Sequence, residues 1–151
     1  MTLYEFLKYI HVVLAIIAIG FNASYGIWLA RAAKEPEHAG YVLKGVKVLD
    51  DRFANPAYAL LLVTGVTMVL LEDIPFSTFW IAAGLVLYVF AVVGGLFGYT
   101  PVLRNQILLF EAGKTESAEY QKLTKRGTFI GILLALDVLT IEFLMVTKPT
   151  L

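Results

Sequence analysis

The chain has 151 residues, of which 59% are hydrophobic and only 16% are charged. Because soluble domains are roughly half apolar and a quarter charged, this composition predicts one integral membrane domain over 1–151. The formal net charge is zero, which argues against nucleic acid as a partner. The absence of cysteine excludes disulfides, thiol chemistry, iron–sulfur clusters and covalent haem attachment.

The first apolar stretch runs from Tyr4 to Leu29. It is long enough to cross a bilayer, since about 20 apolar residues span about 30 Å. Its polar and small residues recur at spacings of three and four, so they share one face of the predicted helix. We expect this face to contact protein or a cavity rather than lipid. The face consists of Tyr4, Lys8, His11, Ala15, Ala18, Asn22, Tyr25 and Leu29.

The rest of the sequence predicts three further spans, which makes the fold class all-α, an integral membrane four-helix bundle. The second span is short and begins at Pro56, so part of the charged segment 34–55 should be a helix that leads into it. Pro101 should bend or end the third span. The predicted spans cover about 3–33, 56–71, 78–99 and 127–146.

Small and polar residues mark the third and fourth spans. Gly94 and Gly98 lie four residues apart, a spacing that permits close helix approach. The polar segment 114–126 is predicted to be a loop, with Thr115 or Ser117 as a helix cap.

Lysine and arginine gather before the second span and before the fourth span. The turn between the second and third spans has none, and the ends of the chain hold only Lys8 and Lys148. By the positive-inside rule we predict a multi-pass protein of the inner (cytoplasmic) cell membrane, with both termini on the outer side. The basic residues of the two cytoplasmic segments are Arg31, Lys34, Lys44, Lys47, Arg52, Arg104, Lys114, Lys122, Lys125 and Arg126.

Four ionisable side chains lie inside the predicted spans at two matching depths. Counting the helical rise from the outer edge places Lys8 and Glu142 about 6 Å deep, and His11 and Asp137 about 10 to 13 Å deep. An unpaired Asp near the bilayer centre costs about 2.5–3.5 kcal/mol, so we predict the pairs Lys8–Glu142 and His11–Asp137. The two acids are about 140° apart around their helix, so one of them should face another helix, a groove or another subunit. Asn22 should hydrogen-bond across helices.

Three short motifs carry a family resemblance. The motifs are Tyr4-x3-Lys8-x2-His11, Gly20-Phe21-x3-Tyr25-Gly26, and Arg52-Phe53-x-Asn55-Pro56 followed by Thr64-Gly65. With them the sequence resembles a bacterial family of four-helix predicted integral membrane proteins of unknown function. More distantly, it is similar to HemJ-type protoporphyrinogen oxidases and copper-resistance-D-like membrane proteins. The resemblance implies that His11 is an axial ligand of a b-type haem. The functional lysine of the HemJ-type third helix has no counterpart in 78–99, so the oxidase reaction is not implied.

The leading hypothesis is a membrane protein that binds haem b or a related porphyrin through His11, in a redox or porphyrin-handling role. His11 is the only histidine within the spans. The second ligand to the iron would be Lys8, Tyr25, the His11 of another chain, or none.

The alternative hypothesis is a cofactor-free transporter component or an accessory subunit of a membrane complex. On this hypothesis a buried polar seam acts as a proton or ion relay, or simply as ion pairs. The seam consists of Lys8, His11, Asn22, Asp137 and Glu142. Four helices are few for a self-sufficient transporter, so this hypothesis predicts a homo-oligomer or other membrane subunits. No hydrolase, phosphate-loop or zinc motif is present, and no catalytic residue is predicted.

Overall fold

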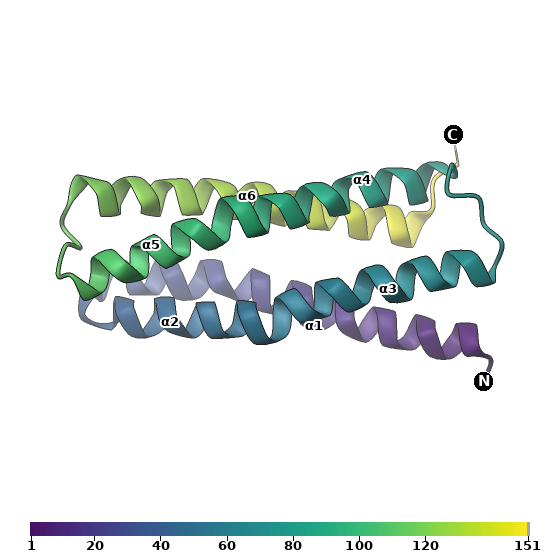
Figure 1. Ribbon diagram of the computed structural model, residues 1–151, viewed down its shortest axis with the longest axis horizontal. Coiled ribbons are helices and arrows are strands. Elements are labelled where there is room, and N and C mark those ends of the chain that lie inside the picture. Colours follow the sequence, from purple (N-terminus) through teal and green to yellow (C-terminus); the bar gives the residue numbers. More distant parts are fainter. Residues whose placement is uncertain (151) are drawn as a thin grey trace.

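The computed structural model describes residues 1–150, and in this range it consists of four long helical rods (Figure 1). The rods contain 30, 36, 33 and 30 residues, and each is long and apolar enough to cross a membrane. The predicted all-α fold with four apolar spans is therefore confirmed. The elements are α1 (Leu3–Ala32), η1 (Pro36–His38), α2 (Ala39–Leu49), η2 (Asp50–Ala54), α3 (Asn55–Leu71), α4 (Phe79–Val93), η3 (Gly94–Tyr99), α5 (Thr100–Glu111) and α6 (Ala118–Thr147).

Side-chain caps fix where the first and last rods begin. Thr2 Oγ1 accepts a hydrogen bond from the Glu5 N–H at 3.1 Å, and Glu5 Oε2 accepts one from the Thr2 N–H at 2.8 Å. At α6, Ser117 Oγ accepts from the Tyr120 N–H at 3.1 Å, as expected for a cap. The prediction of a loop over 114–126 was wrong beyond this cap. The polar residues 118–126 favour a helix once Ser117 Oγ satisfies one of the free N–H groups of its first turn. The helix α6 therefore extends the predicted fourth span at its polar end.

Two prolines lie inside the second and third rods without ending them. Each proline is preceded by a π-helical segment, η2 before Pro56 and η3 before Pro101. Proline lacks an N–H and its ring displaces the carbonyl four residues earlier, and a wider π turn accommodates both effects. The expected helical lead-in to the second span is confirmed, and the predicted limits 56–71 and 78–99 were too short.

The rods form two antiparallel pairs, α1 against α3 and α4 against α6 (Figure 1). Both termini lie at one end, here called the terminal end, and the opposite end is called the loop end. Toward the loop end, α2 packs on α5 and on α1, which joins the two pairs. Within residues 1–150, α3 and α4 make no close backbone contact, so the pairs separate toward the terminal end.

The best-packed part of the protein is an apolar cluster toward the loop end. It is made of Tyr25, Leu43, Val46 and Leu103, which are all at most 3% exposed. By contrast, large apolar side chains such as Val86 and Phe97 are 69% and 76% exposed. Such exposure over rods of this length is what a lipid-facing surface requires.

Glycines allow α4 and η3 to approach α6 closely, as the spacing predicted. A Cβ built at Gly94 would lie 2.8 Å from Leu134 Cδ2, and one at Gly98 would lie 3.6 Å from Ile130 Cδ1. At the terminal end, the Lys148 ammonium sits 5.1 Å from the Trp80 ring centroid and ties the end of α6 to the start of α4.

Candidate functional site

His11 is held on α3 by a side-chain hydrogen bond. Its Nδ1 lies 2.7 Å from Thr64 Oγ1. The Thr64 hydroxyl also lies 2.8 Å from the Leu60 carbonyl oxygen of the preceding turn. In the tautomer with the proton on Nδ1, the hydroxyl accepts from His11 and donates to this carbonyl, and the lone pair of the imidazole lies on Nε2. Gly65 leaves room for the ring, since a Cβ there would lie 3.2 Å from His11 Cε1.

The two predicted ion pairs, Lys8–Glu142 and His11–Asp137, are not formed within the described residues. Lys8 is exposed and Glu142 is half-buried. The physical reason is that α1 packs mainly along α3 and touches α6 only briefly. Equal depth along two helices does not bring side chains together when the helices belong to different pairs.

Asp137 is the buried acid of α6. Its side chain is 7% exposed, and its Oδ2 has no hydrogen-bond partner among residues 1–150. Tyr58 of α3 lies within electrostatic range of this carboxyl group. Asp137 therefore belongs to the space where the two helix pairs meet.

Tyr58 connects polar groups from three helices. Asn22 Nδ2 donates to Tyr58 Oη at 3.1 Å and to the Ala18 carbonyl at 2.9 Å. Tyr88 of α4 donates its hydroxyl to the Tyr58 carbonyl at 2.9 Å. The predicted cross-helix bond of Asn22 is confirmed, although its side chain lies at an exposed rim. We call the polar groups that the structure places here the polar seam, which differs from the predicted seam in lacking Lys8 and Glu142. Its members are His11, Asn22, Tyr58, Thr64, Tyr88 and Asp137.

The sequence did not identify Tyr58, Thr64 or Tyr88 as site residues. Thr64 and Tyr88 each interrupt an apolar run, and Thr64 also belongs to the Thr64-Gly65 motif of the family resemblance, but neither signal names a contact. Their role depends on which helices pair, and the sequence pattern does not contain that information.

The possible haem ligands are unevenly placed around His11. Lys8 lies one turn away on the same face of α1. Tyr25 lies 14 positions further along α1, about 21 Å by the helical rise, too far to bind the same iron atom. The Tyr25 side chain is 3% exposed, and its hydroxyl has no hydrogen-bond partner among the described residues.

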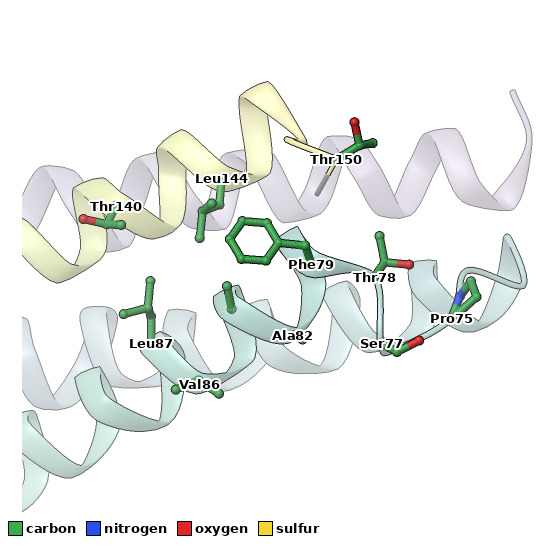
Figure 2. A pocket seen from close by; sticks show the side chains of 11 residues that line it. Pro75, Ser77, Thr78, Phe79, Ala82, Val86, Leu87, Thr140, Leu144 and Thr150 are labelled. Atoms are coloured by element: carbon green, nitrogen blue, oxygen red, sulfur yellow. The ribbon is translucent and has the colours of Figure 1, made fainter.

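One cavity lies away from the polar seam, between the start of α4 and the end of α6 (Figure 2). Its volume is about 870 Å³. Its walls come mainly from apolar side chains such as Phe79, Val86, Leu87 and Leu144, with no charged side chain. Among residues 1–150 no group of three or more His, Cys, Asp or Glu side chains is placed to hold a metal ion. The cavity therefore suits an acyl chain or a packed helix rather than a charged ligand or a metal ion.

Comparison with known proteins identifies the family of the chain. No curated protein and no solved structure shows significant similarity to it. The more distant resemblance to HemJ-type and copper-resistance-D-like proteins therefore stays a prediction. A family model described as "Predicted integral membrane protein (DUF2269)" matches residues 5–149. With four apolar rods and a match over nearly its whole length, the chain belongs to this family of multi-pass integral membrane proteins of unknown function.

Proposed function

We propose that this protein conducts protons, alone or as a subunit of a larger membrane complex, through the polar seam. The observation that carries this proposal is the buried and unpartnered carboxyl group of Asp137. The nine residues from Asp137 to Val146 correspond to about 13 Å of helix, which puts the carboxyl group well inside the bilayer. A carboxyl group at that depth is costly and typically marks a proton or ion pathway.

The polar seam supplies further groups that exchange protons. Tyr58 lies near Asp137, and its hydroxyl already accepts a bond from Asn22. Nearer the terminal end, His11 keeps Nε2 free to accept a proton while Thr64 fixes Nδ1. Carboxyl, phenol and imidazole groups at successive depths are the usual components of a proton relay.

The test is proton uptake by vesicles that contain the purified protein and a trapped pH-sensitive dye, under an imposed potassium diffusion potential. We expect uptake by the wild type, and uptake at the rate of protein-free vesicles for Asp137→Asn. Glu142→Gln is the matched control, because Glu142 is the other acid in the apolar part of the same helix but is only half-buried. Wild-type uptake equal to that of protein-free vesicles, or unchanged uptake by Asp137→Asn, overturns the proposal.

We also propose that the terminal end faces the outside of the inner membrane, and that the protein works as a homo-oligomer or with other subunits. The lysine and arginine residues at the loop end support the orientation. Because the chain has no cysteine, single substitutions report directly on sidedness. Ser77→Cys should react with an impermeant thiol reagent in intact cells, and Thr115→Cys should react only after the cells are broken. Light scattering in detergent measures the oligomeric state.

A second candidate function is the binding of a b-type haem or porphyrin through His11. The specific observation is the Thr64 bond, since ligand histidines commonly bond through the ring nitrogen that does not bind the metal. The His11 imidazole can supply one axial ligand to a haem iron. The nearest further donor on α1 is Lys8, and the cavity between α4 and α6 does not touch His11. The second ligand would therefore be Lys8, the His11 of a second copy, or none.

An absorption spectrum decides between the two functions. For a haem protein we expect a Soret band, with α and β bands after dithionite reduction, that His11→Ala abolishes. Protein purified from haem-supplied cells without these bands rules out the haem function and leaves the proton pathway standing.

A further inference from the structure

Asp50 is a second buried acid, well separated along the sequence from Asp137. It begins η2 and is 7% exposed. Its Oδ2 accepts one hydrogen bond, from Asn55 Nδ2 at 3.2 Å. It forms no ion pair among residues 1–150, and the nearby Lys47 is instead paired with Asp51. The carboxylate is therefore withdrawn from water without a directly bonded cation, which is unfavourable unless something neutralises its charge.

Two tyrosines from other rods lie near this carboxylate. The segment η2 packs on α1, and Tyr25 of α1 and Tyr99 of η3 lie within electrostatic range of Asp50. Neither bonds to it directly within the described residues, and the buried Tyr25 hydroxyl has no partner there. A ligand that contacts both the carboxylate and this hydroxyl would satisfy two buried groups at once.

The backbone around Asp50 is also irregular. Asp50 lies in η2 and Tyr99 lies in η3, so both π segments contribute to the same site. Because Pro56 has no N–H, the carbonyl of Arg52 loses the donor that a regular helix would supply. In membrane proteins, interrupted helices with released carbonyls are a common setting for bound monovalent cations.

The site is sealed from the loop end by the apolar cluster. Leu43, Val46 and Leu103 pack around the ring of Tyr25 and are at most 3% exposed. Water therefore does not reach Asp50 easily from that end, and a ligand bound there stays desolvated and in direct contact with oxygen atoms.

We propose that Asp50 binds a small monovalent cation. The ligands are the carboxylate and the Tyr25 hydroxyl, both hard oxygen donors that suit such ions, while the Asn55 amide N–H holds the carboxylate in place. A single buried carboxylate balances one positive charge, whereas a divalent ion typically takes several acids, and no such group is present in 1–150. The site goes beyond the proton pathway and does not depend on the role proposed for Asp137.

The experiment uses sodium as the probe. The midpoint of thermal unfolding is measured in detergent at constant pH and ionic strength, with sodium chloride replacing choline chloride. We expect the midpoint to rise to saturation with sodium in the wild type. Asp50→Asn should abolish the rise, and Asp73→Asn, which changes an exposed acid in the turn between the second and third rods, should keep it. Asp137→Asn should also keep it, which separates this site from the proton pathway.

Tyr25→Phe is the second variant, because it keeps the packed ring and removes only the hydroxyl ligand. We expect the sodium concentration at half-saturation to increase about ten-fold, the effect of one lost polar contact. Binding of radioactive sodium by the folded variants gives an independent readout. The proposal fails if sodium does not shift the wild-type midpoint, if the shift survives in Asp50→Asn, or if the midpoint responds to pH alone.

Discussion

At the residue scale, His11 and Asp137 show two different ways to place an ionisable group inside a membrane bundle. His11 has a fixed partner in Thr64, so one ring nitrogen is occupied and the other is defined. Asp137 has no partner for Oδ2 among residues 1–150. The first arrangement gives a defined orientation, and the second leaves a group that is free to gain and lose a proton.

The Thr64 bond predicts the effect of Thr64→Val. Valine keeps the shape but leaves His11 Nδ1 without an acceptor, which costs about 1–3 kcal/mol when the donor is buried. Unfolding in a mixed detergent series measures the loss. Thr67→Val is the matched control, since the Thr67 hydroxyl bonds only to the Val63 carbonyl of its own helix. Equal losses in the two variants would show that His11 does not depend on Thr64.

At the element scale, the sequence predicted each helix but not the helix that it packs against. The repeating face of α1 correctly placed Ala18 and Tyr25 in the interior. The helical rise gives the height of a side chain, whereas its partner depends on which helices pair. Because α1 packs on α3, His11 is hydrogen-bonded to Thr64 and not to Asp137. Pro101 misled in a different way, because the sequence allowed it to end the third span, whereas a π segment accommodates it and the rod continues.

The close packing of η3 on α6 predicts opposite outcomes for two adjacent glycines. A Cβ at Gly94 would meet Leu134, whereas one at Gly95 would meet nothing within 4 Å. Gly94→Ala should lower the free energy of unfolding by about 1–3 kcal/mol through overpacking. Gly95→Ala should be neutral or stabilise by up to about 1 kcal/mol. Detergent unfolding of both variants measures the difference, and a larger loss for Gly95→Ala would contradict this packing.

The π segment η3 predicts that Pro101→Ala straightens the third rod. Spin labels at the exposed positions Val86 and Leu108 are 22 residues apart, a separation of about 33 Å in a regular helix. We expect the measured distance to move toward that value in Pro101→Ala. Pro75→Ala, in the turn outside the helices, should leave it unchanged. If Pro101→Ala has no effect on this distance, the π segment is caused by the glycines of η3 and not by Pro101.

At the scale of the whole molecule, the two helix pairs are joined firmly toward the loop end and weakly toward the terminal end. The apolar cluster, α2 on α5, and the ion pair of Lys44 with Glu111 at 2.7 Å hold the loop end. Within 1–150, α3 and α4 share no close backbone contact, and the Tyr88 hydroxyl on the Tyr58 carbonyl bridges them. Access to the polar seam from the terminal end therefore depends on how far the pairs separate.

This arrangement predicts that Tyr88→Phe opens the terminal end. One hydrogen bond contributes about 0.5–1.5 kcal/mol, so its loss should shift the ratio of closed to open molecules about two- to ten-fold. Spin labels at the exposed positions Val63 of α3 and Val86 of α4 report the separation. Tyr9→Phe, which alters a 64% exposed tyrosine on α1, should leave the distance distribution unchanged. If Tyr88→Phe also leaves it unchanged, side-chain packing rather than this bond sets the separation of the pairs.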